Sequence, residues 1–577
     1  MSGKVKVLKY LKPYAAYVVL APLMMVLEVF MDLQQPALMA VVVNDGILGQ
    51  DMAVVASACV KMLAAAIAGM IGGFGCTVFA MLAAMNYGTD VRDSLFRKTE
   101  SFSFNEIDKF STGSLVTRLT NDVTQMQNII SMALRMFVRS PLLCVGGIVM
   151  TLSISARYGI VLMICLPVIV CIILVVYKKI MPVFTALQKK LDRLNAILQE
   201  NLAGVRVIKA FVRGGYEEAR FEAANEDLTR TSLYAMNIMA VIAPIMMIIM
   251  NAVVLAVIYI GGYEVQAARM RVGDVMAAIS YMTQILMSFM MMGMAFATIP
   301  RAKASADRIR EVLETEPSIT GGSLTGEITY GDITFEDVTF AYPGGEGEPV
   351  LKNISLHIKA GEHIGLLGST GAGKSSLVNL IPRFYDVTGG RVLIDGTDVR
   401  EYELTALRSR ISFVLQEPVL FSGTMEENIK WGDPDAERDA VEKAASDAQA
   451  GEFIAALSDG YDSELGQRGL TLSGGQKQRA CIARALIKQP KILILDDSTS
   501  SLDLGTEARM NAAIDAGYKD GTRLTIAQRI ASVKGADRIY VLDGGVIAAS
   551  GTHDELLAVS GLYRDIYESQ MGQGAIT

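Results

Sequence analysis

A short glycine-rich stretch carries the clearest chemical signal in this sequence. Residues 368–375 fit the pattern G-x-x-x-x-G-K-[ST] at every fixed position. In such a loop, backbone N–H groups point at phosphate oxygens, the lysine places a charge beside the outer phosphates, and the final hydroxyl can bind Mg²⁺. A chance glycine-rich turn is disfavoured, because an apolar run precedes the loop and a helical run follows it. The predicted phosphate-binding residues are Gly368, Ser369, Thr370, Gly371, Ala372, Gly373, Lys374, Ser375 and Ser376.

A carboxylate and a second glycine-rich stretch lie farther along the chain. Asp496 follows the apolar run 492–495, which has the pattern of a buried strand, and this position suits a ligand of Mg²⁺. Residues 472–476 open directly into a basic helical run at 477–486. This pentapeptide, together with the phosphate-binding loop at this spacing, resembles the ATP-binding cassette (ABC) family. It consists of Leu472, Ser473, Gly474, Gly475 and Gln476.

The resemblance implies roles for further residues. Tyr342 matches the aromatic residue that stacks on adenine, although an ordinary tyrosine at a strand end is the alternative. Gln416 matches the glutamine that contacts Mg²⁺ and water, and Asp503 ends a loop that crosses to a partner cassette. The implied cofactors are therefore ATP and Mg²⁺. The implied residues around the metal ion are Ser375, Gln416 and Asp496.

Two positions depart from the family pattern on the phosphate-binding side of the site. Where the family has a glutamate that orients the attacking water, this chain has Asp497, whose side chain is one methylene shorter. Where the family has a histidine that contacts the γ-phosphate, this chain has Gln528, which can donate a hydrogen bond but carries no charge. A further departure is Gln467, in a loop where exporters usually have glutamate. The two catalytic positions, Asp497 and Gln528, are thus predicted to be degenerate.

The intact pentapeptide gives these departures a specific meaning. Cassettes of this family pair head to tail, so each ATP lies between one chain's phosphate-binding loop and the other chain's pentapeptide. A homodimer would have two weakened sites. We therefore expect a heterodimer with a second half-transporter that supplies the missing glutamate and histidine, while this chain's pentapeptide completes the partner's site.

Composition indicates a membrane protein with a soluble part. Apolar residues make up 51% of the 577 residues, and the mean hydropathy is +0.36. The net charge of −7 argues against a nucleic-acid partner, which would call for a basic face. Apolar runs long enough for a membrane helix are predicted at residues 13–44, 62–89, 140–156 (extended back to 129), 158–177, 231–263 and 275–300.

The elements that position the site follow from this division. The predicted fold is multidomain: a six-helix transmembrane α domain of ABC exporter type, then an α/β P-loop nucleotide-binding domain. The predicted bounds are 1–315, a linker at 316–327, and 328–577. Charged helical segments after spans two and four should extend the membrane helices, with short contact helices near 102–112 and 211–221. Lysine and arginine cluster on one side, which predicts a multi-pass protein of the plasma or inner membrane with both termini in the cytoplasm.

The transported substrate leaves a weaker signal in the sequence than the nucleotide site does. Glu28 and Asp32 lie four residues apart in the first apolar run, so they share a helix face and suggest a cation-preferring cavity, unless they are merely solvated near the headgroups. Methionines in spans five and six could line a cavity that adapts to varied apolar molecules, or could be filler. The candidate cavity residues are Glu28, Asp32, Met246, Met250, Met290 and Met294.

The preferred function is ATP-driven, multidrug-type export of small hydrophobic compounds, with cationic ones as a candidate class, across the lipid bilayer. A lipid or peptide translocator and an importer on the same fold are alternatives. A channel gated by ATP, or a regulatory nucleotide-binding subunit, is the alternative from another class.

Overall fold

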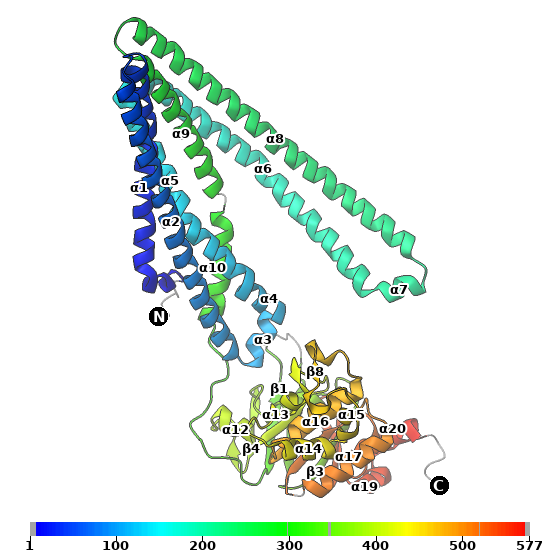
Figure 1. Cartoon of the computed structure of the whole chain (residues 1–577). Coiled ribbons are helices and arrows are strands. Elements are labelled where there is room, and N and C mark those ends of the chain that lie inside the picture. Colours follow the sequence, from blue (N-terminus) through cyan, green and yellow to red (C-terminus); the bar gives the residue numbers. More distant parts are fainter. Residues whose placement is uncertain (1–6, 297, 344–347, 519, 572–577) are drawn as a thin grey trace. The chain divides into compact units, whose positions relative to one another are not determined.

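The structure, a computed structural model, describes residues 7–296, 298–343, 348–518 and 520–571 (Figure 1). The chain divides into two compact units. One comprises Met1–Glu100 and Thr112–Thr315, and the other comprises Ser101–Ser111 and Glu316–Thr577. The second unit therefore includes a short stretch that lies, in sequence, between two membrane helices.

Long helices build the first unit (Figure 1). Among the described residues, six helical segments are long and apolar enough to cross a membrane, which confirms the six predicted spans. The helices of this unit are α1 Ala15–Val41, α2 Met52–Glu100, α4 Thr112–Thr117, α5 Val123–Ile154, α6 Tyr158–Ala203, α7 Val205–Ala210, α8 Gly214–Gln266, α9 Val272–Phe296 and α10 Ile299–Glu314.

Close packing and a few polar contacts hold these helices together. At Gly72 of α2, a Cβ atom would lie only 2.8 Å from the carbonyl oxygen of Met24, so glycine lets α2 approach α1. Tyr281 of α9 donates its hydroxyl to the backbone oxygen of Leu33 in α1 at 2.7 Å. Such internal hydrogen bonds suit a lipid environment, where no water would satisfy these groups.

Three helices are much longer than a membrane crossing requires. α2, α6 and α8 contain 49, 46 and 53 residues, whereas about 20 residues span the hydrocarbon core. α6 and α8 run antiparallel as a pair joined through α7 (Figure 1). Lys190 of α6 pairs with Asp227 of α8 at 2.6 Å, and both residues lie outside the apolar runs of their helices. The predicted extensions are therefore present.

Of the two short contact helices that the sequence predicted, one lies where it was expected and the other does not. The first is α3 (Phe104–Phe110), as predicted near 102–112, and it belongs to the second unit. The second is α7, at Val205–Ala210, so the prediction of a short helix over 211–221 was wrong. The reason is local: Gly204 ends α6, Val212 takes a positive φ of 53° in the turn, and α8 already begins at Gly214.

The described residues of the second unit form a six-stranded sheet, a four-stranded sheet and a two-stranded sheet of β7 and β8. The six-stranded sheet has the order β12-β11-β3-β10-β9-β6, in which β12 alone runs antiparallel to its neighbour. The four-stranded sheet, β2-β1-β4-β5, is antiparallel. The strands are β1 Ile333–Phe340, β2 Leu351–Ile358, β3 His363–Gly368, β4 Gly389–Ile394, β5 Thr397–Asp398, β6 Ile411–Val414, β7 Gly423–Thr424, β8 Glu464–Leu465, β9 Ile492–Asp496, β10 Thr522–Ile526, β11 Arg538–Asp543 and β12 Val546–Gly551.

Helices accompany these sheets and share their core. Residues 316–327, predicted as a linker, lie against the four-stranded sheet's end, where the N–H of Leu324 donates to the oxygen of Glu401 at 2.9 Å. Besides α3, the helices are α11 Lys374–Asn379, α12 Leu404–Ser409, α13 Met425–Lys430, α14 Arg438–Asp447, α15 Gly451–Ala455, α16 Gly474–Ile487, α17 Leu504–Gly517, α18 Ile530–Val533, α19 His553–Val559 and α20 Gly561–Met571.

Candidate nucleotide site

The carboxyl ends of four parallel strands gather the residues that the sequence singled out. The phosphate-binding loop follows β3, Gln416 follows β6, Asp496 ends β9, and Gln528 follows β10. In open parallel sheets, ligands bind at this edge because the loops there converge. All of β9 is buried, as its apolar sequence requires, so Asp496 is held rigidly at its end.

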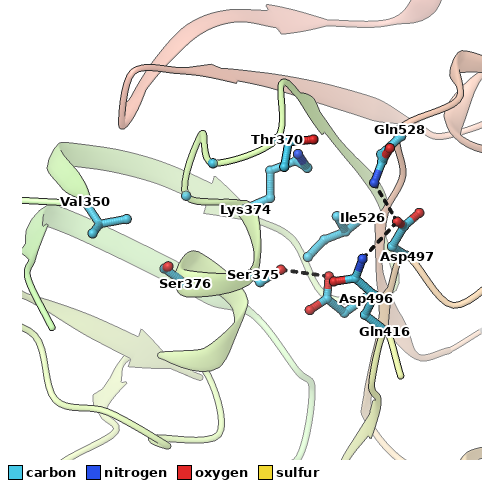
Figure 2. Close-up of a pocket in the computed structure, with 12 residues that line it drawn as sticks. Val350, Thr370, Lys374, Ser375, Ser376, Gln416, Asp496, Asp497, Ile526 and Gln528 are labelled. Carbon is cyan, nitrogen blue, oxygen red and sulfur yellow. Dashed lines mark hydrogen bonds between the residues drawn. The ribbon is translucent and has the colours of Figure 1, made fainter. Parts of the chain in front are cut away.

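The phosphate-binding loop wraps a cavity of about 280 Å³ (Figure 2). Gly373 has a φ of +98°, a conformation that glycine adopts without steric cost, and it leads directly into α11. The ammonium of Lys374 donates to the carbonyl oxygens of Gly368 and Ser369, each at 2.8 Å. Burial lowers the pKa of Lys374, while Asp497 and Asp496 oppose that shift. The loop thus presents a positive charge and open backbone to the cavity.

Most predicted residues of the phosphate site line this cavity, and a few do not. Gly368 and Ser369 line a neighbouring cavity, and Ala372 is buried in the core beneath the loop. The predicted residues that line the main cavity are Thr370, Gly371, Gly373, Lys374, Ser375, Ser376, Gln416, Asp496, Asp497 and Gln528.

The two adjacent aspartates make different contacts (Figure 2). Asp496 accepts a hydrogen bond from the hydroxyl of Ser375 at 3.0 Å, so two of the oxygens predicted to hold Mg²⁺ already lie together. Asp497 instead accepts from the amide of Gln528 at 2.8 Å and, at 3.5 Å, from that of Gln416. Burial raises the pKa of both carboxyl groups, and the bond from Gln528 partly offsets this for Asp497.

The same oxygen of Asp497, Oδ2, accepts both amide hydrogen bonds. Asp497 also has a φ of +46°, an uncommon conformation for a residue other than glycine. The backbone conformation of Asp497 therefore sets the direction of its short side chain, and the hydrogen bond from Gln528 holds the carboxylate in place. A carboxylate held in this way has less freedom to reach a water molecule at the γ-phosphate.

Tyr342, the residue proposed to stack on adenine, contacts α11, the helix that follows the phosphate-binding loop. The hydroxyl groups of Tyr342 and Ser376 share a hydrogen bond of 3.0 Å, and the Tyr342 ring is partly exposed. Its edge meets the ring of Tyr385, with centroids 5.1 Å apart. Tyr385 in turn donates its hydroxyl to Asp108 of α3 at 2.8 Å, while Phe104 of α3 lies 6.0 Å from the Tyr385 ring.

The pentapeptide begins a regular helix. Ser473 is the N-cap of α16 in a capping box with Gln476, whose oxygen accepts from the Ser473 N–H at 2.8 Å. A Cβ atom at Gly475 would lie 3.1 Å from the carbonyl oxygen of Ser501, so a side chain there would crowd the loop that leads to Asp503. The exposed carboxylate of Asp503 caps α17 through the Thr506 N–H, and these hydrogen bonds lower its pKa.

Two stretches of the chain match known protein families. Residues 18–289 match the ABC transporter transmembrane region, and residues 351–500 match the ABC transporter family. The chain belongs to the ABC transporters. It is 42% identical over 568 residues to the uncharacterized ABC transporter ATP-binding protein YfiB of Bacillus subtilis, covering 98% of this chain and 99% of that protein.

Two further similarities refine the class of this ABC transporter. The ATP-dependent lipid A-core flippase of Syntrophus aciditrophicus is 33% identical over 506 residues, covering 87% of this chain and 84% of that one. The solved structure of a bacterial Atm1-family ABC exporter with ATP bound has a TM-score of 0.80 and 27% identity, covering 97% and 99% of the two chains. This ABC transporter is therefore an exporter half-transporter that binds ATP and couples its hydrolysis to transport.

The membrane unit of this ABC transporter holds a cavity of about 610 Å³, lined by side chains of α1, α2, α5 and α9. Glu28 lines it, as predicted, but Arg139 of α5 forms an ion pair with Glu28 and a second one with Asp32, the latter at 2.9 Å. The prediction of a cation-preferring cavity assumed that these two carboxylates were free. The arginine occupies the position that a cationic substrate would need, so the geometry does not support that preference.

None of the predicted methionines that the structure describes lines this cavity. Met246 is buried between helices, and Met250 and Met290 pack against the same cluster without lining the cavity, while the Met294 side chain lies outside the described part of the chain. The methionines that do line the cavity are Met25, Met136, Met287 and Met291.

Three functional contacts escaped the sequence analysis. Gln570 of α20 donates to the backbone oxygen of Gln528 at 2.7 Å and accepts from the Ile530 N–H at 2.9 Å, which holds the segment after β10. Neither this contact nor that of Tyr385 leaves a sequence signal. Arg139 does, because an arginine inside an apolar helix needs an acidic partner, and two acids lie in another membrane helix.

Proposed function

We propose that this chain is the degenerate-site subunit of a heterodimeric exporter of small hydrophobic and amphipathic molecules. In this proposal, the chain's own phosphate-binding loop holds Mg²⁺ and ATP with little turnover. Its pentapeptide, Leu472 to Gln476, completes the hydrolytic site of a partner half-transporter that carries the glutamate and the histidine missing here.

The hydrogen bond between Gln528 and Asp497 carries this proposal. The two residues that replace the family's catalytic pair contact each other at 2.8 Å, so the carboxylate is engaged by a neutral amide. A general base must reach the proton that it removes, and a misplacement of about 1 Å can cost about 100-fold in rate. A neutral amide also offers no positive charge to the developing charge on the γ-phosphate.

Mg²⁺ fits the remaining part of the site. The Ser375 hydroxyl and the Asp496 carboxylate lie 3.0 Å apart, and Gln416 lines the same cavity. Mg²⁺ in nucleotide sites is held by one or two carboxylates together with the substrate's phosphates, and when bound it neutralises phosphate charge. We therefore assign Ser375, Asp496 and Gln416 to the metal ion, and the loop 368–376 to the phosphates.

The cavity in the membrane unit supports a substrate with a large apolar part. Four methionine side chains line it, and methionine repacks easily around different apolar shapes. A lipid translocator is the second candidate, because two ATP-dependent lipid A-core flippases are each 33% identical to this chain over about 500 residues. In both cases we place the protein in the plasma or inner membrane, with both termini on the cytoplasmic side where ATP is available.

Steady-state ATP hydrolysis tests the heterodimer. The purified chain alone should hydrolyse ATP slowly, and co-purification with a half-transporter that has the glutamate and histidine should raise the rate by about tenfold or more. Rapid turnover by the chain alone would contradict the proposal. Transport into vesicles separates the remaining classes, because a pump accumulates its substrate against a gradient and a channel only dissipates one.

A further inference from the structure

A second cavity in the membrane unit lies beside the one described above. It measures about 460 Å³ and is formed by α2, α5 and the start of α10. Arg135 and Met136 of α5 line both cavities, so the two spaces meet at this point of α5. Four methionines form much of the apolar wall of the second cavity: Met81, Met85, Met132 and Met136.

Of the described residues that line this second cavity, Arg135 alone carries a charge. The other arginine of this helix face, Arg139, is already paired with Glu28 and Asp32. Among the described residues, no carboxylate lies within ion-pair distance of Arg135, and its side chain is exposed. Its guanidinium therefore offers donors that the protein itself does not use.

Four charged side chains lie in or beside the two cavities. Arg139 with Glu28 and Asp32 carries a net charge of −1, held together by direct ion pairs on the side of α1. Arg135, one helical turn away on α5, carries +1 and lines both cavities. These four charges sum to zero, but among the described residues Asp32 lines neither cavity, so the charges of Glu28, Arg135 and Arg139 that do line them sum to +1. Because Arg135 has no ion-pair partner of its own among the described residues, its guanidinium is available to an anion that enters either cavity.

We propose that Arg135 binds the anionic headgroup of an amphiphile whose hydrocarbon part lies against the four methionines. A guanidinium suits this task because its donors fit a carboxylate or a phosphate in pairs. Met81, Met85 and their neighbours provide flexible apolar contact without selecting one shape. The proposal rests on the proposed export function, and it specifies the substrate as anionic where the sequence predicted a cationic one.

A matched set of ligands tests the charge preference without any mutation. The full chain is placed in nanodiscs of phosphatidylcholine, without ATP, and loaded with the fluorescent fatty acid cis-parinaric acid. Oleate, oleamide and oleylamine share one hydrocarbon chain and differ in the charge of the head. Oleate should displace the probe best, and the amide and the amine should be weaker by about 10-fold or more, as expected for a lost charge-assisted hydrogen bond. Equal displacement by all three would overturn the proposal.

Three variants then locate the effect. Arg135→Gln should reduce the preference for oleate by about 10-fold, and Arg135→Glu should shift the preference toward oleylamine. Arg269→Gln, which removes an exposed arginine outside both cavities, should behave like the unmodified chain. If oleate is preferred but neither change at Arg135 alters that preference, the anion binds elsewhere and the assignment is wrong.

Two further arms define the ligand. Acetate, which has the charge but no chain, should fail to displace the probe, whereas phosphatidic acid should displace it better than diacylglycerol. Displacement by acetate would show that a free anion suffices and would contradict an amphiphile site. Because none of these measurements uses ATP, they are independent of the hydrolysis assay, and a failure of the heterodimer proposal would not be confused with a failure of this one.

Discussion

If this chain's own site is weak, as we propose, restoring the glutamate and the histidine of the family should make it competent. The perturbation is Asp497→Glu combined with Gln528→His. In the structure, Oδ2 of Asp497 is 2.8 Å from the Gln528 amide, so the two replacements remove a contact that holds the short carboxylate as well as adding reach and charge. Each single change leaves one partner of the old pair in place.

The size of the effect follows from this geometry. The added methylene extends the carboxylate by about 1.5 Å, which exceeds the displacement of about 1 Å that can cost about 100-fold in rate. A histidine at position 528 adds a donor for the charge on the γ-phosphate, and such donors contribute about 100-fold or more. We expect the double variant to gain about 100-fold or more, and each single variant much less, because groups that act together are not additive.

The assay is steady-state hydrolysis of Mg²⁺-ATP by the chain alone in nanodiscs, with nucleotide binding measured in parallel. Asp497→Asn is the matched control, since it removes the charge without adding reach, and it should show no gain. If the double variant binds ATP as the unmodified chain does but hydrolyses it no faster, Asp497 and Gln528 do not limit the reaction. The reasoning on the degenerate site would then be refuted.

Four other predictions use different parts of the structure. In the proposed heterodimer, Gly475→Asp should abolish most ATP hydrolysis, because it crowds the adjoining loop and would place an anion in the proposed partner's site. Asp497→Asn should lower the rate only modestly, and equal losses would show that this chain's own site is catalytic. Because burial raises the pKa of Asp496, this carboxylate is protonated at a higher pH than an exposed aspartate, so Mg²⁺-dependent nucleotide affinity should fall as the pH is lowered toward that pKa, and Asp496→Asn should flatten the binding profile. Tyr385→Ala should raise the KM for ATP several-fold by loosening Tyr342, while Tyr385→Phe keeps the ring and should leave KM nearly unchanged, which a titration of hydrolysis against ATP would check. Arg139→Gln leaves two carboxylates of α1 without their partner, so the free energy of unfolding of the membrane unit should fall by about 1–3 kcal/mol. The affinity for cationic ligands should not rise.

The order and type of the membrane helices could be read from the sequence because lipid allows few solutions. A run of about 20 apolar residues must be helical to satisfy its own backbone, so the existence of each span followed directly. The position of the second short helix did not follow. Whether the turn falls before or after Phe211 depends on Gly204 and on the left-handed conformation of Val212, which no periodicity reports.

The nucleotide site was predictable for a different reason. Its residues belong to motifs with fixed spacing, and the strand pattern placed Asp496 at a buried strand end in advance. The partners of those residues were not predictable, because Gln528 and Asp497, or Tyr342 and Tyr385, meet only through tertiary packing. The pairing of Glu28 with Arg139 is the clearest example: the sequence shows a charge in an apolar helix, but only the fold shows what neutralises it.

The position of α3 in the sequence affects the folding of this protein during translation and the choice of bounds for a cassette fragment. The ribosome synthesises Ser101–Ser111 more than 200 residues before the rest of the unit to which it belongs. Until Phe384 and Tyr385 have been translated, Phe104 and Asp108 lack the residues that they contact in the folded unit. A recombinant cassette fragment that begins at residue 316 would lack this helix for good. The sides of Phe384 and Tyr385 that α3 contacts would stay uncovered, and a synthetic peptide of residues 101–111 should bind to such a fragment.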